Sequence, residues 1–391
     1  MNNWRLAEVW NAATLAREER PNTPRNYMWA SELGKGVADV ILRMRGEEPT
    51  NPPNARSRRK FEAGNIFEWI VRLVLLRSGI LTNSQERVVH QYEGLLEVTG
   101  KLDFEAGGVP NYDAALDSLG VIELPDVINR GTTALLEYLK EKYPNGLENK
   151  LIEVKSTSAY MFDAMERTGK ASRNHRLQLT HYLKAKGYES GVIIYICRDD
   201  LRMLEIEVFL DAENEAEYRK EIEEMTRVYN SGEMPPLEPR VIYDEDTERF
   251  SKNWQIAYSM YLTKLYGIKD QAEFDDTYGP VALRWNNVLN RMRTAAARQR
   301  WLDGANLKEE SVQYEKIEGK RTKKHFVEID GNKIYIPEHL TKSYEMTDKN
   351  LEAIREMQAE GFAPYELANR MKDPAPDEDE ATNQDYLATD I

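Results

Sequence analysis

The chain has 391 residues, of which 41% are hydrophobic and 31% charged, and its formal net charge is −14. It therefore has room for two or three domains. No apolar run approaches the roughly 18–20 residues that cross a bilayer, and the N-terminus has no apolar signal-peptide core, so no membrane partner is expected. The single cysteine, Cys197, excludes an internal disulfide, an all-cysteine zinc site and a four-cysteine iron–sulfur cluster, and it favours a reducing cytoplasm.

Up to about residue 235 the predicted order is a helix, three strands, a helix and two strands, which predicts an α/β fold with a central mixed β-sheet flanked by helices rather than a doubly wound sheet. The long helix is expected to have an apolar stripe made of Phe61, Trp69, Ile70, Leu73 and Val74. Residues 105–149 interrupt the pattern as an insertion rich in Gly, Pro and Asn. The predicted elements, in chain order, are helices over 4–20 and 58–77, a hairpin of strands 84–92 and 95–104, a helix near 132–142, a strand over 151–156, a helix over 173–187, strands over 191–197 and 202–210, and a charged helix over 213–230.

The proline-rich segment 234–239 is the predicted domain boundary. Beyond it, residues 240–372 are expected to form a mainly helical C-terminal domain, with helices over 250–302 and 347–371 and a hairpin over 326–336. Its aromatic side chains suit an ordinary core or a surface for DNA or a partner, and a core is favoured. They include Trp254, Tyr258, Tyr261, Trp285 and Trp301, with Arg291 among them.

Charge is distributed unevenly along the chain. Residues 373–391 contain seven acidic side chains and no Lys or Arg, which predicts an acidic disordered tail. Local patches rather than net charge govern contact with phosphate, but for any one basic cluster a solvated helix face is the favoured interpretation. The basic clusters are Arg56, Arg58, Arg59 and Lys60; Arg167, Lys170, Arg173 and Arg176; Arg291, Arg293, Arg298 and Arg300; and Lys320, Arg321, Lys323 and Lys324.

Charged side chains interrupt the apolar strand 151–156. Side chains alternate along a strand, so Glu153 and Lys155 share one face. Charges on a buried strand are costly unless something pairs with them, and a divalent cation is one such partner. Asp103 on an earlier strand and the backbone carbonyl of Val154 would supply further oxygen ligands for Mg²⁺ or Mn²⁺. The competing interpretation is a cross-strand ion pair between Lys155 and Asp103, and the two strands alone do not decide between them.

Two further pairs of residues lie one helical turn apart. Gln178 and Tyr182 share a helix face with His175. Gly64 and Glu68 are also four apart, and a glycine there would let another backbone approach closely. Taken alone, Tyr182 is a plausible core residue and Glu68 a plausible solvent-facing one.

Four motifs follow one another in the order Gly64-x-x-x-Glu68, Gly100-x-x-Asp103, Glu153-x-Lys155 and Gln178-x-x-x-Tyr182. Together they resemble the PD-(D/E)XK nuclease superfamily, in the branch of RecB-type nuclease domains and phage lambda-type exonucleases, over about residues 25–210. The segment from Tyr27 to Gly34, which contains Ser31-Glu32-Leu33, is similar to the one that opens such domains. The chain departs from the pattern at Glu68, where many members carry His, and in its long insertion.

The resemblance implies a restriction-endonuclease-like core and a Mg²⁺-dependent deoxyribonuclease, most simply an exonuclease of DNA recombination, repair or phage DNA metabolism. Asp103 and Glu153 would be metal ligands and Lys155 the catalytic lysine, with Glu68 as a further catalytic candidate. Gln178 and Tyr182 would contact DNA and order the site. From the same helix, His175 and Arg176 are added as DNA-contact candidates. A recombination or single-strand-annealing protein is a candidate partner, an oligomer is compatible, and the compartment would be the host cytoplasm if the protein is phage-encoded.

Two alternatives stay open, namely a catalytically inactive DNA-binding or assembly module on the same fold and an endonuclease. Other enzyme classes have less support in the sequence. The five histidines show no zinc-binding spacing, and neither a phosphate-binding helicase loop nor a serine-hydrolase elbow is present. Cys197 lies in an apolar strand and is interpreted as a core residue rather than a nucleophile.

Overall fold

The structure is a computed structural model, and it describes residues 5–16, 22–111, 132–245, 247–304, 311–317, 320–329, 332–336, 338–340 and 347–372. The chain divides into two compact units. Unit 1 comprises Met1–Glu238 and Ser259–Gly267, and unit 2 comprises Pro239–Tyr258 and Ile268–Ile391. The predicted acidic tail, 373–391, lies outside the described residues. No described helix is long and apolar enough to cross a membrane.

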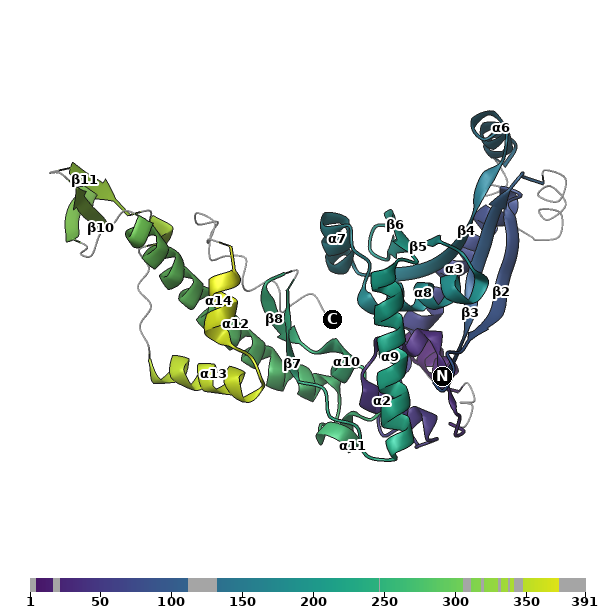
Figure 1. Cartoon of the computed structure of the whole chain (residues 1–391), viewed down its shortest axis with the longest axis horizontal. Coiled ribbons are helices and arrows are strands. Elements are labelled where there is room, and N and C mark those ends of the chain that lie inside the picture. The colour runs from purple at the N-terminus through teal and green to yellow at the C-terminus, as the bar shows by residue number, and fades with distance from the viewer. Residues whose placement is uncertain are drawn as a thin grey trace. The chain divides into compact units, whose positions relative to one another are not determined.

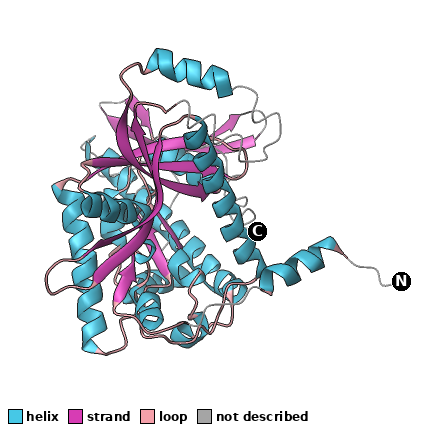
Figure 2. Ribbon diagram, turned by 90° about the vertical axis from the view of Figure 1, so that its right-hand side faces the viewer, coloured by secondary structure: helices cyan, strands magenta, loops and turns pink. Residues whose placement is uncertain are grey.

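Unit 1 is a mixed α/β structure with one sheet and helices on both of its faces (Figure 2). This confirms the predicted fold class. Its elements are α1 (Leu6–Leu15), β1 (Tyr27–Trp29), η1 (Ala30–Glu32), α2 (Val37–Met44), α3 (Ala55–Arg77), β2 (Leu81–His90), β3 (Glu97–Gly108), α6 (Thr132–Lys142), β4 (Leu147–Thr157), α7 (Ala159–Thr168), α8 (Arg173–Lys186), β5 (Ser190–Cys197), β6 (Met203–Phe209), α9 (Ala212–Ser231) and α11 (Leu262–Tyr266).

The sheet runs in the order β1-β3-β4-β5-β6, and β2 pairs with the other edge of β3. β2 and β3 form the predicted antiparallel hairpin, and Gly94 provides the positive φ of +75° that its turn requires. β3 and β4 are antiparallel, β4 and β5 are parallel, and β5 and β6 are antiparallel. α6 lies beyond the paired ends of β3 and β4 (Figure 1). β3 continues to Gly108 and β4 begins at Leu147, so both ends of the predicted insertion, 105–149, belong to strands of the sheet.

Two apolar cores lie on the opposite faces of this sheet. On one face, Val71 and Leu75 of α3 pack with Ile152 and Val154 of β4. On the other face, helices α2, α7, α8 and α9 cover the sheet, and Tyr182 belongs to that core. Glu153 and Lys155 alternate with Ile152 and Val154, so their side chains point to the α8 face.

The apolar stripe predicted for α3 is wrong. Four of its five members are exposed, and Leu73 alone is buried. The helix instead turns Val71, Leu73 and Leu75 inward. Many apolar side chains on all sides of α3 gave the sequence no unique stripe, and the opposing sheet selected the inner one. The exposed members are Phe61, Trp69, Ile70 and Val74.

Several parts of unit 1 were not predicted. They include helix α2, helix α7, which follows β4 in the chain, and the short strand β1, which pairs in parallel with the start of β3. Segment 259–267, with α11, follows a stretch of unit 2 yet belongs to unit 1. Cys197 is fully buried at the end of β5, as expected for a core residue.

Unit 2 is mainly helical, as predicted. Trp285 of α12 is buried and packs against Phe250 and Phe362 in its core, whereas Trp254 and Tyr258 are exposed. Tyr261 is buried in unit 1. The β7–β8 hairpin was not predicted. The elements of unit 2 are β7 (Val241–Asp244), β8 (Arg249–Lys252), α10 (Trp254–Ala257), α12 (Gln271–Gly304), β9 (Ser311–Ile317), β10 (Lys320–Ile329), β11 (Asn332–Tyr335), η2 (Glu338–Leu340), α13 (Asp348–Ala359) and α14 (Pro364–Arg370).

Candidate active site

The candidate site lies where β3 and β4 separate. Their pairing ends at Phe104 and Ile152, and beyond that point β4 continues beside β5 only. Asp103 is the first residue of β3 past the separation. Its carboxylate Oδ2 accepts a hydrogen bond of 2.9 Å from the backbone N–H of Val154. The Asp103 side chain thus takes the place of a backbone carbonyl of β3 as the hydrogen-bond acceptor for Val154, and this contact fixes one carboxylate next to Glu153.

Glu153 is buried and only partly satisfied. Its side chain is 1% exposed, and Oε1 accepts a hydrogen bond of 2.5 Å from Lys155 Nζ. Its other oxygen, Oε2, is buried and has no hydrogen-bond partner among the described residues. The predicted alternative, an ion pair between Lys155 and Asp103, is therefore not the pairing that forms. An unpartnered buried carboxylate oxygen is costly, and it marks a position for a bound positive group.

Glu68, on α3, lies close enough to the strand edge at Asp103 for the charges of Asp103 and Lys155 to act on it. Its Oε1 accepts a hydrogen bond of 2.7 Å from Gln85 Nε2 on β2. Gln85 has a φ of +56°, and it interrupts the regular pairing of β2 at the position opposite Asp103. Such a backbone costs roughly 1–3 kcal/mol in a residue other than glycine. We interpret Gln85 as a positioning residue that sequence reasoning missed, because nothing in the strand pattern marks it.

Burial raises the pKa values of all three carboxylates, and neighbouring acids add to the shifts of Glu153 and Glu68. Burial, and then the nearby Asp103 charge, raise the pKa of Glu153 to about 8, although Lys155 opposes the shift. Burial and Asp103 likewise raise the pKa of Glu68 to about 7, against Lys155 and Arg72. Burial also raises the pKa of Asp103. The site therefore gathers more acidic groups than the single positive charge of Lys155 can balance in their ionised form.

Helix α8 supports the site from the other side. Gln178 Nε2 donates a hydrogen bond of 3.0 Å to the Tyr182 hydroxyl, which in turn donates one of 2.9 Å to the carbonyl of Lys101 on β3. Gly100 makes room for this ring, because a Cβ there would lie 2.7 Å from Tyr182 Cε1. Gln178 and Tyr182 are both buried, so in the structure they hold β3 in place next to Asp103.

No protein-family model and no curated protein matches the chain. Solved structures similar to parts of it include SSO0001, which is 16% identical and has a TM-score of 0.37; the match covers 67% of this chain and 96% of that one. Others are an alkaline exonuclease from Laribacter hongkongensis and its complex with dAMP, which are 13% and 14% identical. Each match covers 57% of this chain and 93% of the other, with a TM-score of 0.31. Likeness at this level assigns no family.

The chemistry of the donor set fits a hard divalent cation. Mg²⁺ takes one or two carboxylates, keeps several waters, and needs no complete protein cage. Within the described part of the chain, no three His, Cys, Asp or Glu side chains form such a cage. Asp103 and Glu153 supply two carboxylates. The Val154 carbonyl points to the same strand edge as its N–H, which faces Asp103.

His175 and Arg176, the other candidates for DNA contact, lie in the first turn of α8. His175 Nδ1 is 3.0 Å from the Tyr195 hydroxyl. Burial, with Lys155 and Lys35 nearby, holds the pKa of His175 well below its usual value, so the ring is neutral. Arg176 forms an ion pair with Glu217 of α9. The DNA contacts of both residues stay predictions.

The segment from Tyr27 to Gly34, which the sequence resemblance singled out, has a structural role. Glu32 is buried and accepts hydrogen bonds from the Arg25 guanidinium at 2.5 Å and from the backbone N–H of Trp29 at 2.9 Å. Gly34 has a φ of +70°, and a Cβ there would lie 3.0 Å from Asn174 Cα of α8. This segment therefore braces α8 rather than supplying a further carboxylate to the site.

The two motif glycines are expected to respond in opposite ways to alanine. Gly100→Ala forces its Cβ against Tyr182 and Ala30, so it should lower the free energy of unfolding by roughly 1–3 kcal/mol. At Gly64 the nearest atom to a Cβ is Ser156 Oγ, at 3.9 Å. The close backbone approach predicted there is wrong, and Gly64→Ala should stabilise helix α3 by about 0.5–1 kcal/mol. Urea denaturation measures both changes, and stabilisation by Gly100→Ala would contradict the packing of Tyr182.

Proposed function

We propose that the protein is a divalent-metal-dependent DNA nuclease. The observation that carries the proposal is the meeting of Asp103, Glu153 and Lys155 at the separation of β3 and β4, with Glu153 Oε2 buried and unpartnered. Phosphodiester hydrolysis needs more than the ~10²–10⁴-fold that a lone general base supplies. A cation site beside an ammonium group offers the remaining stabilisation.

Asp103, Glu153 and the Val154 carbonyl would hold the cation. A divalent ion bound there would acidify a water molecule and neutralise charge on the scissile phosphate. Because burial raises the pKa of Glu153 to about 8, cation binding at neutral pH would displace a proton from this carboxyl. Asp103 keeps its orientation through the N–H of Val154, and this contact fixes the spacing of the two acids.

Lys155 has two tasks in this proposal. Its ammonium group orients Glu153 through the 2.5 Å hydrogen bond. With its side chain 22% exposed, it is also within reach of a substrate, where it would hold the attacking water and offset charge that develops on the phosphate. Burial alone would lower the pKa of Lys155, but the nearby acids Glu153 and Asp103 together raise it, so Lys155 stays protonated at neutral pH.

Glu68 and the Gln178–Tyr182 pair complete the proposed machinery. Glu68, held by Gln85 and with its pKa raised to about 7, is suited to exchange a proton with water near the cation. Gln178 and Tyr182 are proposed to position β3, and any DNA contact they make would require their buried polar groups to exchange partners. The sequence resemblance favours an exonuclease over an endonuclease.

The test is digestion of end-labelled linear DNA by the full chain, with Mg²⁺ or with EDTA. Lys155→Ala should lower the rate by roughly 10²–10³-fold, because it removes the group that aligns Glu153 and the water. Lys150→Ala is the matched control, because Lys150 lies on the same strand but pairs with Glu207 at the surface. Covalently closed circular DNA then separates an exonuclease, which cannot begin on it, from an endonuclease.

The proposal fails if wild-type protein releases no nucleotides or fragments, or if Lys155→Ala is as active as wild type. Retention of DNA in gel shifts without any metal-dependent cleavage would support the inactive binding module instead. Cleavage that persists in EDTA would agree with a nuclease but would contradict the proposed dependence on a divalent cation.

A further inference from the structure

Helix α3 exposes an unusual number of large apolar side chains beside the candidate site. Phe61 is 62% exposed and Trp69 is 45% exposed. Ile66, Ile70 and Val74 of the same helix are also exposed. Exposed apolar side chains that gather on one element mark an interaction surface more often than isolated ones do.

The charge of α3 is opposite to that of the chain as a whole. The helix contains six basic residues and two acidic ones, although the protein carries a net charge of −14. Arg56 and Arg72 are exposed. Arg72 lies one turn from Glu68, and its charge acts on that carboxyl. Such a surface favours a polyanion over an acidic or neutral protein partner.

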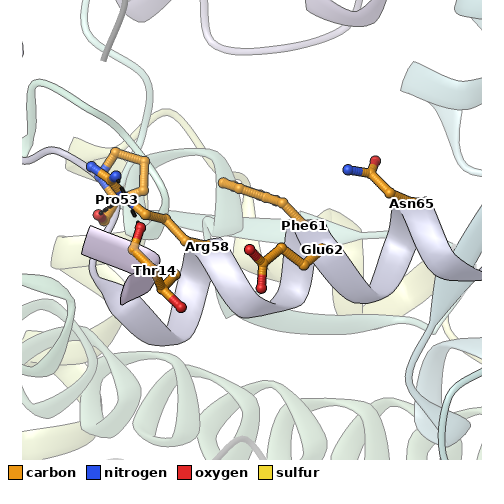
Figure 3. Close-up of a pocket in the computed structure, with 6 residues that line it drawn as sticks. All are labelled: Thr14, Pro53, Arg58, Phe61, Glu62 and Asn65. Atoms are coloured by element: carbon orange, nitrogen blue, oxygen red, sulfur yellow. Dashed lines mark hydrogen bonds between the residues drawn. The ribbon is translucent and has the colours of Figure 1, made fainter. Parts of the chain in front are cut away.

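The exposed groups line up with the site. Phe61, Asn65, Glu68 and Arg72 follow one another at intervals of four, three and four residues, which places them on one side of a helix. Trp69 follows Asn65 by four residues and belongs to the same stripe. Phe61 and Asn65 project from the same side of α3 (Figure 3). Phe61 also borders a shallow pocket of about 200 Å³ at the junction of α1 and α3, beside Pro53. The stripe therefore leads from an apolar pocket to a carboxylate of the site.

We propose that this stripe is a stacking platform for single-stranded DNA next to the cleavage site, with bases stacked on Phe61 and Trp69 and a phosphate held by Arg72. The proposal rests on the proposed nuclease function and names the form of DNA that lies at the site. Aromatic side chains among basic groups are the common means of binding unpaired strands, because every base has a face that stacks. A duplex buries those faces and could use only the positive charge.

The experiment measures the affinity of the full chain for a fluorescein-labelled oligothymidylate by anisotropy in EDTA, so that no cleavage occurs. A second oligonucleotide of equal length carries abasic sites, which keep the phosphates and remove the bases. Phe61→Ala and Trp69→Ala are compared with Phe209→Ala and Trp254→Ala, which remove exposed rings from β6 and α10. Phe61→Tyr keeps a stacking ring.

We expect Phe61→Ala and Trp69→Ala each to weaken binding of oligothymidylate by roughly 5- to 100-fold and to leave binding of the abasic strand unchanged. Phe61→Tyr should restore wild-type affinity, and the two control variants should match wild type. Arg72→Ala should weaken binding of both strands and lower the salt slope by about one. All of these side chains are exposed, so thermal melting of the variants should match wild type.

The inference is overturned if Phe61→Ala and Trp69→Ala do not alter the affinity, or if they weaken binding of abasic and normal strands equally. It is also overturned if light scattering shows an oligomer that these two variants dissociate while their DNA affinity is unchanged, because the stripe would then bind a second copy of the chain. If wild-type protein cleaves DNA but these binding tests fail, only the stacking platform is overturned and the nuclease proposal stands. Base-dependent binding without any cleavage would instead overturn the nuclease proposal alone, and protein that neither binds nor cleaves would overturn both.

Discussion

Glu153→Gln is expected to lower Mg²⁺-dependent DNA cleavage by on the order of 10⁴-fold, because the cation loses a charged ligand that contributes several kcal/mol. The fold should persist, since glutamine has the same shape and its amide oxygen can accept the hydrogen bond from Lys155 Nζ. Single-turnover rates at saturating Mg²⁺ measure the effect. Asp103→Asn should show a loss of similar size, although its amide oxygen can still accept from the N–H of Val154.

Glu207→Gln is the matched control for this experiment. Glu207 lies on β6, its side chain is 40% exposed, and it pairs with Lys150. Its replacement should leave the cleavage rate within about twofold, as is usual for a surface pair. If Glu153→Gln retained a tenth of the wild-type rate, Glu153 would not be a ligand of an essential cation.

Glu153→Gln should also stabilise the protein at alkaline pH in the absence of metal. Folding raises the pKa of Glu153 from 4.5 to about 8, so the folded state holds a proton that the unfolded state has lost. Stability from this group is therefore fully present below about pH 4.5 and is lost as the pH rises through 8. Glu153→Gln removes the titration, and near pH 8.5 it should raise the free energy of unfolding by on the order of 3 kcal/mol.

Urea denaturation in EDTA at several pH values between 5 and 8.5 measures this difference. Comparison of wild type with Glu153→Gln cancels groups that do not interact with Glu153, such as His181, whose burial lowers its pKa to about 3 and destabilises the fold in acid. Mg²⁺ should stabilise wild type at pH 8 and have little effect on the variant, since it binds only the folded site. A variant that is less stable than wild type at pH 8.5 would contradict an uncompensated charge at Glu153.

Local sequence signals specified much of unit 1. Gly94 marks the hairpin of β2 and β3, and Gly187 ends α8 with a φ of +74°. Alternation on β4 placed Glu153 and Lys155 on one face, where the structure has them joined by a hydrogen bond. These features depend on the period of a strand or the φ of one glycine, and both can be deduced from neighbouring residues.

Features that depend on distant partners could not be deduced from the sequence. The inner face of α3 was misassigned, because Phe61 and Trp69 are as apolar as Val71 and only the sheet decides which of them is buried. Gln85 reaches Glu68 only because its backbone leaves the strand conformation opposite Asp103. Such a departure arises from tertiary contacts and has no local signal.

The candidate site shows the same division. The motifs supplied the residue types, and the order of strands explains how Asp103 meets Glu153, since β3 and β4 are neighbours that separate at that point. Sequence alone left an ion pair and a cation site as alternatives. The buried and unpartnered Oε2 of Glu153 favours the cation, and this environment arises from tertiary contacts that have no local sequence signal.

The most direct test of the cation site is a crystal structure of the full chain with Mn²⁺, with data collected at the manganese absorption edge. We expect an anomalous peak with oxygens of Asp103 and Glu153 at about 2.1–2.3 Å and Lys155 alongside. A map without a peak at this position, or one in which a protein group occupies Glu153 Oε2, would contradict the account.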